Sequence, residues 1–131
     1  MKDVSNIQRI QPPDLLAPGG HYSHGTVAGG FVFVSGQLPV TPGGERLVNA
    51  PFEVQVRQVL ANVQSVLAAA GSSVDRLVQV RVYLASVDHW PAFNALYAEW
   101  AGPARPARAV VPTGPLHHGL LVEVEAVALS P

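Results

Sequence analysis

One long amphipathic segment, residues 51–71, places the strictest constraint on what this chain can fold into. Its apolar side chains recur with the 3.6-residue period of an α-helix. They are Phe52, Val56, Val59, Leu60, Val63, Val66, Leu67 and Ala70. Pro51 falls in the first turn, where its missing N–H is harmless, and Gly71 marks the end. Such a helix needs an apolar surface against which its stripe can pack, and the flanking segments supply one.

The segments on either side of this helix predict β-strands. Residues 77–86 alternate, so that Val78, Val80, Val82 and Leu84 share one face and Gln79, Arg81 and Tyr83 share the other. Before the helix, a Gly29-Gly30 turn joins β-rich runs near residues 23–27 and 31–35, which predicts a hairpin. Residues 1–20 are expected to form an extended lead-in that contains several prolines.

A second helix and two further strands complete the predicted order. Residues 88–102 predict a helix that is capped by Asp88, has Pro91 in its first turn and carries an inward aromatic stripe. The stripe consists of Trp90, Phe93, Tyr97 and Trp100. Strands are expected near residues 108–111 and 120–129, which gives the order β-β-α-β-α-β-β. Two helices can cover only one face of such a sheet, so residues 1–131 are predicted to form a single α/β domain, an α+β sandwich.

The composition limits the possible classes of protein. Hydrophobic residues make up 48% of the chain and charged residues 13%, about half the usual charged share. So little charge favours a homo-oligomer in which apolar surface is shared between copies. The net charge of −1, without a Lys/Arg cluster, argues against a nucleic-acid partner. No apolar run is long enough for a bilayer and no signal peptide is predicted, so no membrane association and a cytoplasmic location are expected.

The absence of cysteine narrows the chemistry further. The chain has no cysteine, which excludes disulfides, thiol nucleophiles and cysteine-based zinc sites.

Five segments stand in a characteristic order and spacing: VFVSGQLPV, RQVLANVQSVLAAAGSSVDRLVQVRVYL, FNALYAEW, PARAVV and VEVEAVAL. Together they resemble the YjgF/Rid (reactive-intermediate deaminase, RidA-like) family, from about Gly20 to Leu129. The resemblance implies a chorismate-mutase-like fold with a mixed β-sheet, assembled as a homotrimer with sites at the subunit interfaces. It also implies a hydrolase, a cofactor-free deaminase that converts 2-imino or enamine acids such as 2-aminoacrylate to 2-keto acids and ammonia.

The resemblance assigns catalytic roles to Arg108, Glu123 and Tyr22. Arg108 matches a carboxylate-binding arginine, and a guanidinium can hold a planar carboxylate by two parallel hydrogen bonds. Glu123 matches the acid that orients or activates water, which requires a carboxylate whose pKa suits a base. Tyr22 matches a tyrosine that lines the site. By position alone, Arg108 could equally be a surface arginine, and Glu123 with Glu125 could be interface charges.

Further positions match the lining of the substrate pocket. Ser35 and Gly36 match its floor, where a glycine permits close approach of a ligand to the backbone, although the same pair could simply end a strand. Asn94 matches a helix position near the pocket, or is a solvent-facing residue. Val110 stands where many members carry cysteine. Arg105 matches no motif position and is expected to be solvated.

Histidines depart from the family pattern in two loops. His24 follows the first tyrosine, and His117 and His118 stand in the last loop, where they are candidates for substrate binding. With His21 they could cluster at the site, as an altered general acid or the mark of a changed substrate, or as a metal site. They could also be ordinary surface residues. Their spacing lacks the helical repeat of zinc motifs, so no metal is expected.

The functional alternatives differ in class. The first is hydrolysis of small 2-imino acids, and the second is an enzyme of specialised metabolism that takes a larger substrate on the same scaffold. The third is a non-catalytic module that binds a small ligand, because fold does not fix function. A ribonuclease is disfavoured, since a net charge of −1 offers little to neutralise phosphates.

Overall fold

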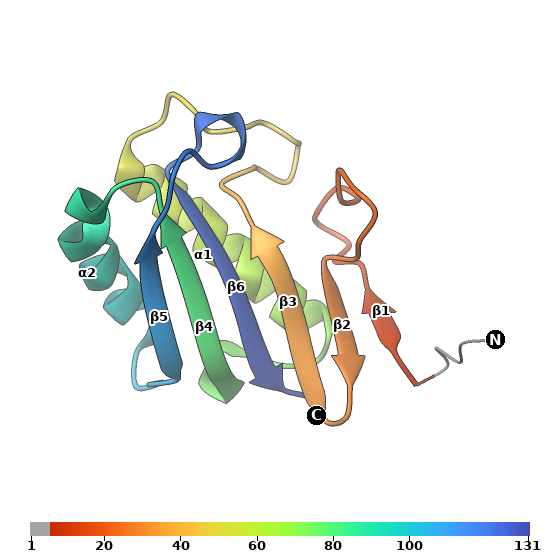
Figure 1. Cartoon of the computed structure of the whole chain (residues 1–131). Coiled ribbons are helices and arrows are strands. Elements are labelled where there is room, and N and C mark those ends of the chain that lie inside the picture. The colour runs from red at the N-terminus through yellow and green to blue at the C-terminus, as the bar shows by residue number, and fades with distance from the viewer. Residues whose placement is uncertain (1–5) are drawn as a thin grey trace.

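Over residues 6–131, a computed structural model shows one mixed six-stranded sheet with two α-helices packed on one face (Figure 1). The strands are β1 (Gln8–Ile10), β2 (Gly25–Ala28), β3 (Phe31–Gln37), β4 (Leu77–Leu84), β5 (Ala107–Pro112) and β6 (Val122–Leu129), and the helices are α1 (Phe52–Ala69) and α2 (Trp90–Ala101). The sheet order is β1-β2-β3-β6-β4-β5. The pair β4–β5 is parallel and the other pairs are antiparallel. The predicted sandwich, with both helices on one face, is confirmed.

The core fills the space between the sheet and the helices. The residues at the predicted helical period are buried from Val56 to Leu67, and Phe52 and Ala70 at the two ends are partly buried. The inward residues of β3, β4 and β6 are buried as well. The hairpin turn is also as predicted: Gly29 and Gly30 adopt φ of 60° and 88°, which suits a tight two-residue turn between antiparallel strands. Burial of this apolar surface is what holds the helix layer on the sheet.

The N-terminal segment contains a strand that the sequence did not reveal. Gln8–Ile10 forms β1 and pairs with β2, so the element order begins with three strands instead of two. Three residues are too few to show alternation, and the pairing is provided by the free edge of β2. Residues 1–5 of the predicted lead-in and domain lie outside the residues that the structure describes.

Three smaller expectations were wrong. A register shift between Leu77 and Gln79 turns Val78 away from the core, so that it is 39% exposed. The helix α2 starts at Trp90, which is 41% exposed, and Asp88 does not cap it. Instead, Asp88 lies in a preceding 3-10 turn, and its N–H donates to the Ser86 hydroxyl. The hydroxyl of Ser86 therefore provides a cap two residues earlier than the Asp88 carboxylate would.

The second face of the sheet has no helix over it in Figure 1. As expected, it carries the polar residues of β4 and β6: Gln79, Arg81, Tyr83, Glu123 and Glu125. Phe31, Phe33, Val111 and Leu129 are exposed on the same side. We call this surface the open face. Within residues 6–131, no helix combines the length and apolar character needed to cross a membrane.

Candidate active site

A β-bulge at the end of β3 creates the most distinctive feature of the open face. The register between β3 and β6 shifts between Val34 and Gln37, which leaves an extra residue at Ser35–Gly36 opposite the acidic part of β6. The Glu123 carboxylate packs directly on Gly36, and a Cβ built on that glycine would collide with it. The absence of a side chain at Gly36 is therefore what makes room for the carboxylate.

Glu123 has the electrostatic setting of a potential base. Burial raises the pKa of its carboxyl group, His117 opposes the shift and the charge of Glu125 reinforces it. Within residues 6–131 its carboxylate forms no hydrogen bond to another side chain. A half-buried carboxylate with a raised pKa and free oxygens can accept a proton from water.

Glu125, two residues along the same strand, is in a different state. Its Oε1 accepts a 2.6 Å hydrogen bond from the Tyr83 hydroxyl and lies 3.5 Å from Arg81 Nη1. This hydrogen bond, reinforced by burial, raises the pKa of Tyr83. The two acids therefore divide their roles: Glu125 is held in a network, whereas Glu123 remains available.

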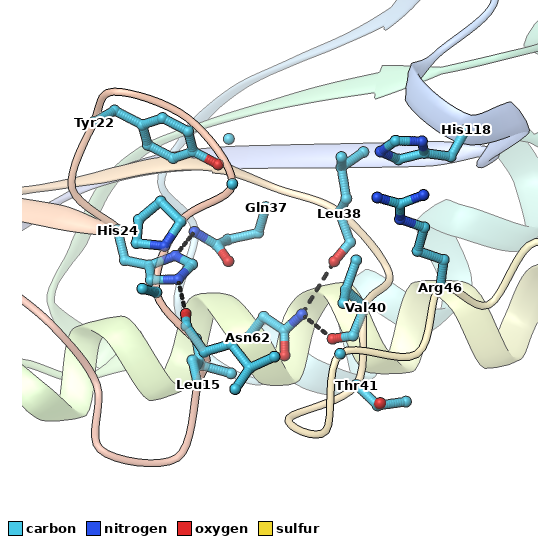
Figure 2. Close-up of a pocket in the computed structure, with 16 residues that line it drawn as sticks. Leu15, Tyr22, His24, Gln37, Leu38, Val40, Thr41, Arg46, Asn62 and His118 are labelled. Atoms are coloured by element: carbon cyan, nitrogen blue, oxygen red, sulfur yellow. Dashed lines mark hydrogen bonds between the residues drawn. The ribbon is translucent and has the colours of Figure 1, made fainter.

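Gly36 also borders a cavity of about 260 Å³ on the side of the first loop. We call it the β3-end cavity (Figure 2). It is lined by Leu15, Leu16, Ala17, Pro18, Gly19, Tyr22, His24, Gly36, Gln37, Leu38, Val40, Thr41, Gly44, Arg46, Asn62 and His118. Four of the residues predicted from the sequence therefore meet here: Tyr22, His24, Gly36 and His118.

Two predicted pocket residues serve as structural links. His24 Nε2 lies 2.7 Å from the Leu16 carbonyl, so it donates there, and Nδ1 then accepts from Gln37 Nε2 at 3.2 Å. With both nitrogens engaged, this imidazole fixes the wall of the cavity. The Ser35 hydroxyl donates to the Ser23 carbonyl at 2.6 Å and closes the loop against the bulge.

Arg108 lies on the other side of the sheet. It pairs with the buried Val80 of β4, and its guanidinium carbon stands 4.8 Å from the centre of the Tyr97 ring on α2. This distance is that of a cation–π contact between the guanidinium and the aromatic ring. Val110 packs against the core on the same face, and Asn94 is half-buried one helical turn before Tyr97.

The structure does not bring Arg108 and Glu123 together within one chain. Arg108 shares a face with Val80, whereas Glu123 pairs with Tyr83 on the open face. The predicted site residues therefore form two groups, one around Gly36 and one around Arg108 on the edge strand β5.

The histidines are likewise only partly gathered. His118 and His24 line the β3-end cavity, His117 lies near Glu123, and His21 is exposed. In the part of the chain that the structure describes, no three His, Asp or Glu side chains form a group able to hold a metal ion.

Replacement of Gly36 and of Gly25 by alanine is expected to lower the stability of the protein by different amounts. At Gly36 the new methyl would displace only the end of the Glu123 side chain, so unfolding free energy should fall by no more than about 1 kcal/mol. At Gly25 it would lie 2.7 Å from Val66 Cγ1 and 3.1 Å from the Phe33 carbonyl oxygen, which cannot move easily. Gly25→Ala should therefore cost about 1–3 kcal/mol. Denaturant unfolding of both variants measures the difference, and equal losses would contradict it.

Comparison with known proteins identifies the relatives of this fold. Residues 13–130 match the family model described as Endoribonuclease L-PSP. The chain belongs to the YjgF/RutC/Rid family. A RutC family protein of Pyrococcus horikoshii is 39% identical over 111 residues, which are 85% of this chain and 88% of that protein.

Solved structures of Rid-family proteins superpose closely. The crystal structure of yeast Mmf1 has a TM-score of 0.89 and 32% identity, and the alignment covers 95% of this chain and 99% of Mmf1. The crystal structure of E. coli TdcF with bound serine has a TM-score of 0.88 and 29% identity, over 95% of this chain and 99% of TdcF. These likenesses confirm the family resemblance and the fold.

Several residues of this Rid-family chain escaped the sequence analysis. Arg46, Gln37 and Asn62 line the β3-end cavity, and Tyr83 holds Glu125. Arg46 lies in a polar loop without periodicity, so no pattern distinguished it. Asn62 interrupts the apolar stripe of α1 and is only 3% exposed. A polar residue on the buried face of a helix was the one available signal.

Proposed function

We propose that this Rid-family chain hydrolyses small 2-imino and enamine acids to 2-keto acids and ammonia. The observation that carries the proposal is the Glu123 carboxylate, half-buried, with a raised pKa, and seated on a glycine that leaves its oxygens unobstructed. The serine bound in the TdcF crystal structure supports an amino-acid-like ligand for this fold.

The reaction requires that the protein position the substrate and supply one base. Glu123 takes a proton from water as the oxygen adds to the imine carbon, which gives a neutral carbinolamine. Glu123 then returns this proton to the nitrogen, the C–N bond breaks as the C=O bond forms, and the hydroxyl proton leaves with the ammonia. In sum, R–C(=NH2⁺)–COO⁻ and H2O give R–CO–COO⁻ and NH4⁺. The iminium is already electrophilic, so no cofactor is needed. An enamine enters the same route after protonation at carbon.

Arg108 would hold the substrate carboxylate, and it would come from a second copy of the chain. In one protomer it faces the helix side at the sheet edge, and Glu123 faces the open side. The exposed apolar residues of the open face support burial against another copy. A closed homotrimer, as the family resemblance implies, would place β5 of each copy against the open face of the next.

The remaining residues would complete the site around these two groups. Tyr22, at the rim of the β3-end cavity, would offer its hydroxyl to ligand or water. The backbone at Ser35–Gly36 would form the floor beneath the substrate. Asn94 and Val110 would lie beside the substrate carboxylate, near Arg108. Val110 would present an apolar side chain there, where many family members carry cysteine.

The test is ammonia release from freshly generated 2-aminoacrylate. The wild-type chain should accelerate release over the spontaneous rate, and Arg108→Ala should lower kcat/KM about 100-fold, because two charge-assisted hydrogen bonds to the carboxylate are lost. Arg105→Ala removes the same charge from an exposed position and should leave the rate unchanged. Equal rates for wild type and Arg108→Ala would remove Arg108 from the mechanism, and no acceleration by wild type would reject the proposed reaction.

An endoribonuclease, which the family description names, is less compatible with this chain. Its net charge is −1, and the β3-end cavity contains one arginine and no lysine. Ribonucleases need several cations to neutralise the phosphates on either side of the cleaved bond.

A further inference from the structure

We propose that the β3-end cavity selects imino acids whose side chain carries a second acidic group, and that Arg46 and His118 bind this group. The inference rests on the proposed function, because it assigns the side-chain end of the same substrate. The ligand class is thus a 2-imino dicarboxylic acid. Arg108 would bind its first carboxylate, and its second would enter the cavity.

The cavity is lined by one permanently charged side chain, the guanidinium of Arg46, and by no acid. Arg46, His24 and His118 are its titratable basic residues, and no Asp or Glu is among the sixteen residues of its lining. Within residues 6–131, the Arg46 guanidinium forms no salt bridge and no hydrogen bond to another side chain. A guanidinium fork without a protein partner, in a concave site without acids, matches a carboxylate ligand.

The loop that carries Arg46 is held in place by a side chain of α1. Asn62 is 3% exposed, and its amide donates to the carbonyls of Leu38 at 3.0 Å and Val40 at 2.9 Å. Val40 and Arg46 in turn form a β-bridge, and Thr41 exchanges backbone hydrogen bonds with Glu45 and Gly44. Arg46 therefore extends from a fixed backbone, so that only its side chain has to be ordered when a ligand binds.

His118 is held opposite Arg46 at a cost in backbone energy. It has φ of 62° and is the only non-glycine residue with positive φ among residues 6–131. Glycine or asparagine would accept this conformation with less strain. Both residues line the cavity, and Figure 2 shows their side chains at the same end of it. Backbone strain that persists beside a cavity points to a role for the side chain.

Gly36 is the residue that the cavity and the proposed reaction centre share. Its missing side chain leaves room for the Glu123 carboxylate, and the same glycine lines the cavity. A substrate with its imine carbon near Glu123 can thus extend its side chain past Gly36 toward Arg46. A volume of about 260 Å³ suits a small metabolite, since pockets for drug-sized ligands measure roughly 300–1,000 Å³.

The experiment compares two imino acids of similar length, generated in place by amino-acid oxidases. One is the imine of L-glutamate, which carries the second carboxylate, and the other is the imine of L-methionine, which is neutral there. The wild-type chain should show the higher kcat/KM with the diacid. Arg46→Ala should lower kcat/KM for the diacid about 10- to 100-fold and leave the neutral substrate within about twofold. Arg46→Lys, which keeps the charge but lacks the fork, should fall between them.

The matched control is Arg57→Ala, which removes an exposed arginine of α1 outside the cavity. It should leave both rates unchanged, and thermal unfolding verifies that every variant is folded. If Arg46→Ala lowers both rates equally, or neither, the acid-selective cavity is rejected while imine hydrolysis stands.

Failure of the proposed function has a separate signature. If wild type hydrolyses neither imine, the proposed reaction is rejected. Calorimetric binding of 2-oxoglutarate and 2-oxobutyrate then tests whether the anion subsite exists. Tighter binding of the diacid that Arg46→Ala abolishes would retain the anion subsite without catalysis. Equal binding of both keto acids, or no binding, would reject the subsite as well.

Discussion

Glu123→Gln is expected to lower kcat by about 10²- to 10⁴-fold and, at the same time, to make the folded chain more stable at neutral pH. The loss of activity follows because an amide cannot accept the proton from water. In the wild type, kcat/KM should rise with pH as Glu123 ionises, with a midpoint above the ordinary glutamic-acid pKa of 4.5, since burial raises the pKa of this group.

The gain in stability follows from the same shift. Because the folded-state pKa of Glu123 lies above its unfolded value, the neutral form is favoured by folding. This contribution is fully present below the unfolded pKa and is lost as pH rises through the folded one. At neutral pH the wild type therefore holds an ionised carboxylate at a cost, which glutamine removes. Solvent screening limits the gain to about 1 kcal/mol.

Denaturant unfolding at several pH values, combined with the ammonia assay, measures both effects on one protein. The difference in stability between wild type and Glu123→Gln should shrink on acidification. Glu125→Gln is the comparison on the same strand: it breaks the hydrogen bond from Tyr83 and should lower stability. A stable, fully active Glu123→Gln variant would exclude Glu123 as the base.

Mixed assemblies of two inactive variants are expected to regain activity. If each site takes Arg108 from one copy and Glu123 from the next, Arg108→Ala and Glu123→Gln chains refolded together in equal amounts will form some sites with both residues intact. For random assembly into a closed ring, this is about a quarter of the sites. Activity should thus rise from about 1% of wild type or less to about a quarter.

Differently tagged chains and native mass spectrometry would establish that the copies have mixed. Each variant refolded alone serves as the control and should stay inactive. Mixed assemblies no more active than their parents would show that the two residues do not serve one site across an interface.

Most of the fold could be predicted from the local periodicity of apolar residues in the sequence. The helix at residues 51–71 and the alternation of residues 77–86 predicted α1 and β4, because side-chain period directly reflects which face is buried. The strand β1 was beyond this reasoning, since its three residues are ordered by pairing with β2. The exposure of Val78 was hidden for a similar reason: the register shift that causes it depends on the partner strand.

The candidate site was predictable only where a motif marked it. The family resemblance selected Gly36 and Glu123, and the structure explains their relation by direct packing. The resemblance could not reveal that Arg108 lies on the face of the sheet opposite to Glu123. The face on which Arg108 lies depends on the parallel register of β5 with β4. Arg46 was hidden for another reason: its surroundings come from the first loop, α1 and the last loop, which are distant in sequence.

The buried amide of Asn62 has a consequence for how such a protein can change. The segment 38–47 is fastened to α1 by this side chain and lies outside the ladder of paired strands, apart from one bridge within itself. Its exposed residues, such as Arg46, can therefore be exchanged without altering the pairing of the strands. Such exchanges would change the lining of the β3-end cavity and leave the sheet as it is.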